Sequence, residues 1–300
     1  MKTYADIVSD GGSDVLGQIS VQSERMRDGL AGIRHIVAVM SGKGGVGKST
    51  VAINLAAAWA RDGKAVGIVD GDINGPTIGR MAGVGRVRAG ISGGRVVPPR
   101  TAGGVKVMTM DLFLNDDTAP VVWDAPTQNN GFAWRGLMEA GALRELVADT
   151  EWGALDYLVV DLPPGSDRLP NLADVVPRIS GAVAVTVPSS VSLGIVGKSV
   201  RMARKYLETP ILGLVENMAA CVCPACGHED ELYPGGHVKK LAEELDLEIL
   251  GHIPFDPLLA AAADEGRSYV DEHTDRPAAR AIMDLAQRIH TLITETATTP

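Results

Sequence analysis

The chain has 300 residues, of which 45% are hydrophobic and 22% charged, so it can bury the core of one large α/β domain and does not have a disordered composition. Its formal net charge of -9 at pH 7 disfavours binding to a nucleic-acid phosphate backbone. The sequence contains no apolar stretch long enough to span a membrane, and its first residues lack the apolar core of a signal peptide. We therefore expect a cytoplasmic protein that binds neither nucleic acid nor membrane.

The order of apolar and polar segments predicts one principal domain. Residues 1–32 are polar at first and then weakly amphipathic, which indicates a leader that ends in a helix. Over 33–290, continuous apolar runs alternate with helical stretches, as in a mainly parallel, doubly wound α/β sheet whose strands are buried on both faces. Within it, 84–101 indicates a hairpin and 112–133 a long polar loop. We expect 291–300 to be a flexible tail.

A phosphate-binding motif follows the first apolar run. Residues 42–49 read GKGGVGKS and match the pattern G-x-x-x-x-G-K-[ST] between a predicted strand and a predicted helix. Glycines let successive backbone N–H groups point at phosphate oxygens, and the helix N-terminus adds partial positive charge. We expect Lys48 to bridge the β- and γ-phosphates of ATP and Ser49 to bind Mg²⁺. The residues expected to contact the nucleotide are Gly42, Lys43, Gly44, Gly45, Val46, Gly47, Lys48, Ser49 and Thr50.

Aspartates end two other apolar runs. Asp161 follows the run at 157–160, as expected for a carboxylate that holds the hydration shell of Mg²⁺. Asp70 and Asp72 end the run AVGIVDGD, so they should lie at the same edge of the sheet. Asp72 is the better candidate for positioning the attacking water. Either of the two could instead cap the end of its strand.

The three cysteines of the chain, Cys221, Cys223 and Cys226, lie within six residues, which favours metal binding over a disulfide framework. Cys223 and Cys226 belong to a C-P-x-C-G turn that directs two thiolates at one metal. Two thiolates are half of what a tetrahedral zinc or a four-iron cluster needs, and a C2 dimer with the loop at 221–228 near its axis would supply the pair twice. The alternative is a local Zn²⁺ site that adds Cys221 and His228.

These motifs occur in an order that resembles the Mrp/ApbC family of ATP-binding iron-sulfur cluster carriers, which are relatives of the MinD and ParA ATPases. The resemblance covers about 33–290. Besides the phosphate loop with its second lysine and the C-P-x-C turn, it rests on DYLVVDLPPGS (156–166), WRGLMEAGALREL (134–146), GLVENM (213–218) and GHIPFDP (251–257). The chain departs from the family where Leu137 replaces a proline and where the segment after Pro164 is one residue shorter.

The resemblance implies a P-loop ATPase that works as a homodimer and hydrolyses ATP slowly. It implies that Lys43 reaches the partner's nucleotide, that Asp72 acts in hydrolysis and that Asn217 contacts the adenine base. It further implies that Cys223 and Cys226 of two chains hold one bridging [4Fe-4S] cluster, which is passed to apo iron-sulfur proteins.

Two other functions remain open from the sequence. One is a spatial-organisation ATPase of the MinD or ParA type, which the acidic charge and the absence of a basic amphipathic C-terminus disfavour. The other is a nucleotide switch that acts as a scaffold and is stabilised by zinc, because ligand type alone does not separate zinc from an iron-sulfur cluster.

Overall fold

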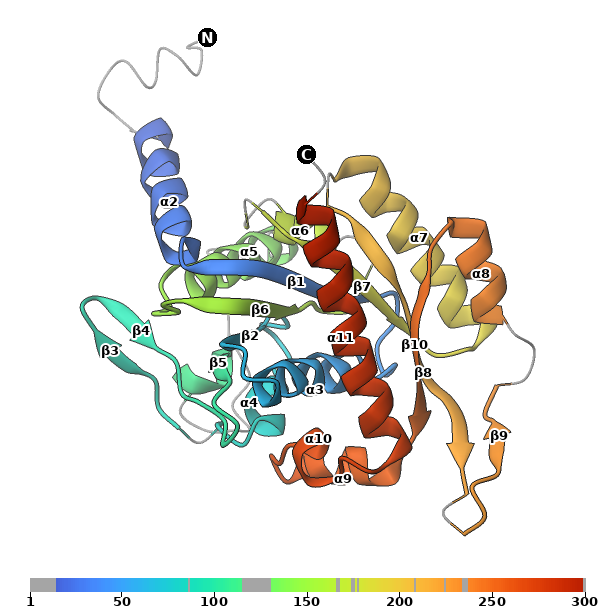
Figure 1. Cartoon of the computed structure of the whole chain (residues 1–300). Coiled ribbons are helices and arrows are strands. Elements are labelled where there is room, and N and C mark those ends of the chain that lie inside the picture. Colours follow the sequence, from blue (N-terminus) through green and yellow to red (C-terminus); the bar gives the residue numbers. More distant parts are fainter. Residues whose placement is uncertain are drawn as a thin grey trace.

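The secondary structure alternates strands and helices along most of the chain (Figure 1). The computed structural model describes residues 15–85, 87–114, 131–165, 168–173, 176, 178–207, 209–223, 225–233 and 237–298. The helices are α2 (Val15–Leu30), α3 (Lys48–Arg61), α4 (Ile78–Met81), α5 (Gly131–Ala148), α6 (Arg168–Ala173), α7 (Ser190–Tyr206), α8 (His237–Leu245), α9 (Pro257–Asp264), α10 (Tyr269–Glu272) and α11 (Pro277–Thr298), with a 3-10 turn at Met110–Phe113. The strands are β1 (Ile33–Ser41), β2 (Val66–Asp70), β3 (Gly90–Ser92), β4 (Arg95–Val97), β5 (Lys106–Met108), β6 (Leu155–Asp161), β7 (Gly181–Thr186), β8 (Ile211–Val222), β9 (Glu229–Glu231) and β10 (Ile249–Phe255).

The central sheet is doubly wound and mainly parallel, as predicted. Within the described ranges its strand order is β10-β8-β7-β1-β6-β2-β5, all parallel, and β9 adds to β8 in the antiparallel direction. In this register Asp161 at the end of β6 lies beside Asp70 at the end of β2 and beside Val39 of β1. The loop after β1 and both aspartates therefore share the carboxyl edge of the sheet.

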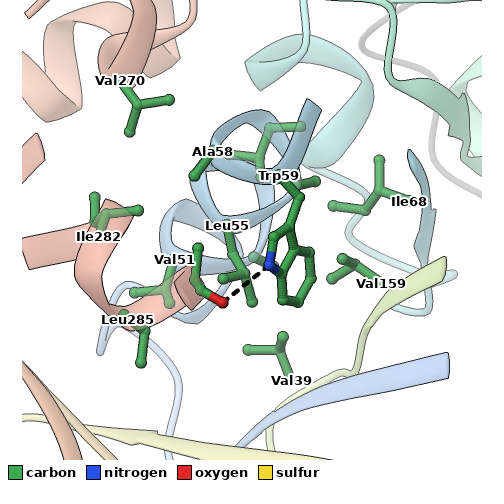
Figure 2. Packing of buried hydrophobic residues seen from close by; sticks show 14 of the residues in the cluster. Val39, Val51, Leu55, Ala58, Trp59, Ile68, Val159, Val270, Ile282 and Leu285 are labelled. Atoms are coloured by element: carbon green, nitrogen blue, oxygen red, sulfur yellow. Dashed lines mark hydrogen bonds between the residues drawn. The ribbon is translucent and has the colours of Figure 1, made fainter. Parts of the chain in front are cut away.

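Two apolar cores lie against the two faces of the sheet. One core contains buried residues of α3, α9, α10 and α11, and the other contains buried residues of α5, α6, α7 and α8. Figure 2 shows Trp59 of α3 in the first core, where its indole N–H donates to the carbonyl of Ala286 at 3.0 Å. The same ring stacks on Tyr157 of β6 with centroids 4.1 Å apart. These contacts fix α3, the helix that follows the phosphate loop, between α11 and the sheet.

The segments outside the central alternation agree with the expectations in part. The hairpin expected within 84–101 is formed by β3 and β4, which pair antiparallel. Most of the polar loop expected at 112–133, namely 115–130, lies outside the described residues, as do 1–14 of the leader. Helix α2 follows them and packs beside α5, and Arg25 Nε of α2 lies 2.6 Å from Oδ1 of Asp149, the residue after the end of α5.

Helix α11 corrects one expected boundary. We expected a flexible tail at 291–300, but α11 continues to Thr298, and Ile293 is buried. Ile289 and Ile293 are one helical turn apart and join the same core, so the apolar face of the helix continues past the expected boundary. Only 299–300 lie outside the described residues at this end.

Candidate functional site

The phosphate loop turns from β1 into α3. Gly45 and Gly47 have φ angles of 79° and 80°, in the left-handed region that favours glycine, and Gly47 caps the N-terminus of α3. Gly42 and Val46 are buried, whereas Gly44 is exposed and Thr50 lies partly exposed in the first turn of the helix. The loop backbone thus has the curvature that lets N–H groups converge on a phosphate.

Three side chains meet at the start of α3. The Lys48 ammonium donates to Asp161 Oδ1 at 2.5 Å, and the Ser49 hydroxyl donates to Asp161 Oδ2 at 2.6 Å. Lys48 Nζ also lies 3.1 Å from Ser49 Oγ. Lys48 is 7% exposed and Asp161 is fully buried. The residues expected to bind phosphate and Mg²⁺ are therefore brought together, and they bind one another in this structure.

The electrostatics of this edge favour cations. Burial raises the pKa of Asp161, against the opposing effects of the Lys48 charge and of the hydrogen bonds from Lys48 and Ser49. Burial, followed by the charge of Asp161, raises the pKa of Asp70 to about 7. Two buried carboxylates side by side are costly to ionise together unless a cation compensates them. A hydroxyl and a carboxylate oxygen are also ligands that suit Mg²⁺, so the donor set fits this ion.

The two aspartates after β2 have different surroundings. Asp70 is fully buried, and its carboxylate accepts hydrogen bonds from the backbone N–H groups of Asp72, Thr77 and Ile78 at 2.8–3.0 Å. It thereby holds the loop between β2 and α4. Asp72 is partly exposed, and its Oδ1 accepts from Gly75 N at 3.2 Å. Asp72 is the more accessible of the two, and its part in hydrolysis stays a prediction.

Lys43 is a residue of the phosphate loop, and Asn217 contacts the loop from β8. Lys43 is exposed, and its backbone carbonyl accepts from the Ser41 hydroxyl at 3.1 Å. Asn217 of β8 is 7% exposed, and its side-chain amide donates to the carbonyl of Val46 at 2.9 Å. The predicted roles, a cross-dimer contact for Lys43 and an adenine contact for Asn217, stay predictions. The contact of Asn217 with the phosphate loop was not expected from the sequence.

The cysteines lie where β8 passes into β9. Cys221 and Cys226 are exposed, Cys223 is half-buried, and Pro224 between them lies outside the described residues. Gly227 N donates to the carbonyl of Cys223 at 2.9 Å, and Cys223 N donates to the carbonyl of His228 at 2.8 Å, which closes a tight turn. Hydrogen bonds from the N–H groups of Ala225 and Cys226, and then from the Cys226 thiol, lower the pKa of Cys223. A thiolate at this position is therefore favoured, and a thiolate is the form that binds metals.

The local zinc site has no counterpart in the residues described. Among them, no group of three or more His, Cys, Asp or Glu side chains comes together as a metal site. The imidazole of His228 contacts a carboxylate instead: its Nε2 lies 3.2 Å from Asp230 Oδ1.

The glycine-rich loop between a strand and a helix, with its lysine and the aspartate at the end of the neighbouring strand, defines a P-loop NTPase. Residues 32–290 match the ParA family model described as "NUBPL iron-transfer P-loop NTPase". The chain belongs to this family, which agrees with the family resemblance read from its motifs.

Curated relatives match most of the chain. An iron-sulfur cluster carrier protein of Pseudomonas fragi is 44% identical over 260 residues, which cover 86% of each chain. A protein of the same name from Saccharolobus solfataricus is 38% identical over 273 residues and covers 91% of this chain and 88% of the relative. The iron-sulfur cluster transfer protein NUBPL of Mus musculus is 38% identical, with 87% and 78% covered.

Two solved structures with the same fold contain a nucleotide. The nucleotide-binding protein from Archaeoglobus fulgidus in complex with ADP is 35% identical, with a TM-score of 0.70 over 85% of this chain and 94% of that chain. MinD from Pyrococcus horikoshii with Mg-ADP has a TM-score of 0.60 at 23% identity, over 89% and 99% of the two chains, and shows the fold alone. No helix in the described part of the chain is long and apolar enough to cross a membrane.

Proposed function

We propose that the protein is an ATP-binding iron-sulfur cluster carrier that hydrolyses ATP slowly, holds a [4Fe-4S] cluster between two copies of the chain and transfers it to apo-proteins. One observation carries the proposal. Cys223 and Cys226 share an exposed turn at the end of β8, and Asn217 of the same strand contacts the phosphate loop. Strand β8 thus runs from a residue in contact with the phosphate loop to the turn that carries both cysteines. The names of the relatives support the kind of cargo.

The stoichiometry of thiolates supports a dimer. A [4Fe-4S] cluster takes four cysteine ligands, whereas the turn offers Cys223 and Cys226. The β8–β9 hairpin projects from the body of the protein (Figure 1), so a second copy can approach it. Two hairpins related by a two-fold axis would supply the pair twice. Transfer to another protein also requires accessible ligands, and in the single chain Cys226 is exposed and Cys223 is half-buried.

The nucleotide cycle is proposed from the contacts at the sheet edge. When ATP binds, the Lys48 ammonium would leave the Asp161 carboxylate and bind the β- and γ-phosphates. Asp161 and Ser49 would then be available to hold Mg²⁺ and its water ligands. Mg²⁺, when bound, neutralises charge on the phosphates. Asp72 would position the attacking water, and Lys43 would reach the nucleotide of the partner subunit. A reaction that needs only positioning and charge stabilisation suits a slow switch.

Reconstitution of cysteine variants tests the proposed function. The protein and its variants are incubated anaerobically with iron and sulfide, and the visible absorbance of the cluster is compared after desalting. We expect Cys223→Ala and Cys226→Ala to lose the cluster and keep ATP binding, because each leaves a dimer with two of four thiolates. Cys221→Ala is the matched control and should keep the cluster.

The zinc alternative predicts another pattern. A local site would depend on Cys221 or His228, would hold Zn²⁺ in the protein as isolated, and would give no iron-dependent absorbance. Retention of the cluster in both Cys223→Ala and Cys226→Ala would contradict the proposal.

A further inference from the structure

Strand β8 connects the two sites of the protein. Its neighbour β7 pairs with it only as far as Glu216, opposite Thr186. Beyond Glu216 the strand continues past the end of β7 towards the cysteine turn (Figure 1). Asn217 is the first residue of this projecting part, and Cys221 lies near its end. Asn217 therefore lies on the same continuous stretch of backbone as the cysteine turn, and this stretch pairs with β10 and β9 instead of β7.

Asn217 is held by the phosphate loop. Its amide donates to the carbonyl of Val46 at 2.9 Å, and both residues are buried. The next residue of the loop is packed so closely that a Cβ atom on Gly47 would lie 2.2 Å from Asn217 Nδ2 and 3.9 Å from Met218 Cε. A hydrogen bond and close packing therefore join the loop backbone to β8. A shift of the loop when phosphate binds would change both contacts.

Met218 gives the strand a bend just after this contact. Its φ is 56°, a left-handed conformation that few residues other than glycine and asparagine adopt readily. The register with β10 changes at the same place, since Asn217 lies opposite Ile253 and Cys221 lies opposite Phe255. β8 thus advances four residues while β10 advances two. A strained residue that persists in a bulge beside a site is a reason to look for a function.

We propose that Asn217 and Met218 are positioning residues that couple occupancy of the phosphate loop to the orientation of the cysteine turn. Asn217 transmits the position of the Val46 carbonyl to β8, and the left-handed backbone at Met218 fixes the direction in which the cysteine turn projects. The inference rests on the proposed function in that the turn is the cargo site. The coupling itself involves residues of one chain and is present without a cluster.

Alkylation of the cluster-free protein measures this coupling. All three cysteines of the chain lie at 221–226, so in a Cys221→Ser background every thiol reports on Cys223 and Cys226. The rate of reaction with iodoacetamide is measured under reducing conditions in a buffer that contains Mg²⁺ but no iron or zinc, first without nucleotide and then with saturating ATPγS. We expect nucleotide to change the rate by about fivefold or more, the lower end of typical coupling between sites.

Asn217→Ala should bring the rates with and without nucleotide to within about twofold of each other at saturating nucleotide, because the link to the loop is gone. Asn54→Ala is the matched control. Asn54 is also buried, and its amide also donates to a backbone carbonyl, that of Thr50 at 2.9 Å, but it belongs to α3 and not to β8. Asn54→Ala should therefore keep the nucleotide effect. Because both rates are compared at saturating nucleotide, a weaker affinity of the Asn217 variant for ATP does not by itself remove the effect of nucleotide on the alkylation rate.

Met218 provides an independent pair of variants. Met218→Asn should keep the nucleotide effect, because asparagine tolerates a left-handed backbone, whereas Met218→Val should lose it, because a β-branched residue does not. An unchanged effect in Asn217→Ala, or no effect of nucleotide in the parent protein, would overturn the inference. The alkylation assay contains no cluster. Failure of cluster reconstitution would therefore contradict the proposed function without affecting the alkylation result.

Discussion

The Lys48 ammonium lies 2.5 Å from Asp161 Oδ1, and both side chains are buried at the edge of the sheet. Lys48 belongs to the phosphate loop and Asp161 ends β6, so the pair joins the two parts of the proposed nucleotide site across 113 positions of the chain. The ion pair compensates a carboxylate that would otherwise be buried without a cation. Under the proposed function, this lysine stabilises the fold when nucleotide is absent and binds phosphate when nucleotide is present.

We predict that Lys48→Ala abolishes ATP binding and also destabilises the nucleotide-free protein. The variant leaves Asp161 buried without its cation, which should cost on the order of 3 kcal/mol of unfolding free energy. Urea denaturation without nucleotide measures the stability, and calorimetric titration measures ATP binding. Near-native ATP affinity in this variant would contradict the assignment of the phosphate loop.

A double variant separates the two effects of this lysine. Lys48→Ala combined with Asp161→Asn removes the unpaired charge together with its partner, so most of the lost stability should return. ATP binding should not return, because no ammonium is available for the phosphates. A double variant as unstable as Lys48→Ala would mean that packing, and not charge, accounts for the loss.

Asp72→Ala should keep ATP binding and lose hydrolysis. Asp72 is partly exposed, and its carboxylate accepts from Gly75 N in its own loop, so its removal should leave the phosphate loop intact. Loss of a residue that positions the attacking water should lower turnover by about 10²-fold or more. Phosphate release and nucleotide titration are measured on the same preparation. Equal loss of binding and turnover would give Asp72 a structural role.

Lys43→Gln should act only when two chains meet. Lys43 is exposed in the single chain, so the variant should bind ATP with near-native affinity. If the ammonium reaches the nucleotide of the partner subunit, ATP-dependent dimer formation and hydrolysis should both fall. Sedimentation with and without ATPγS, at matched concentrations of both proteins, checks this. Unchanged hydrolysis would remove Lys43 from the proposed cycle.

Asp256 offers a test of stability against pH. Its carboxylate caps α9 through Leu258 N at 3.0 Å, accepts from the Tyr269 hydroxyl at 2.6 Å and pairs with Arg276. Burial alone would raise the pKa of Asp256, but the hydrogen bonds from Arg276 and Tyr269 and the cap outweigh it and lower the pKa. The carboxylate is therefore favoured in the folded state, and its stabilisation is present above its unfolded pKa and lost as the pH falls through the lower folded pKa.

Asp256→Asn should accordingly lower the free energy of unfolding by about 1–3 kcal/mol at pH 7. The loss is limited because the Arg276 side chain is partly exposed to solvent, which screens the ion pair. The difference from the parent protein should shrink once the pH falls below about 4. Denaturation midpoints between pH 3 and 7 measure it. A difference that does not depend on pH would assign the effect to shape rather than charge.

The sequence predicts the parts of the fold whose signals are local. Strands such as β1 and β6 are buried on both faces, so their continuous apolar runs identify them, and the phosphate loop is defined by spacing alone. β5 and β9 have three residues each, too few to show a periodicity, and they were not predicted. The extent of α11 depends on the core that Ile293 joins.

The parts of the site that depend on distant contacts could not be predicted. The bond from Asn217 to Val46 joins residues 171 positions apart, and no pattern in either segment indicates it. The sequence favours Asp72 over Asp70 for positioning water but gives Asp70 no role of its own, and only the three backbone donors around Asp70 identify it as the residue that holds the loop. The left-handed backbone at Met218 has no sequence signal, because methionine is not a residue that favours it.

Metal content per chain tests the central claim most directly. The protein is reconstituted anaerobically with iron and sulfide, desalted and analysed for iron, sulfide, zinc and molecular mass. A cluster held by Cys223 and Cys226 of two chains predicts a dimer with about four irons and about four sulfides. One tightly bound zinc per chain in the isolated protein, with no iron retained after reconstitution, would contradict it.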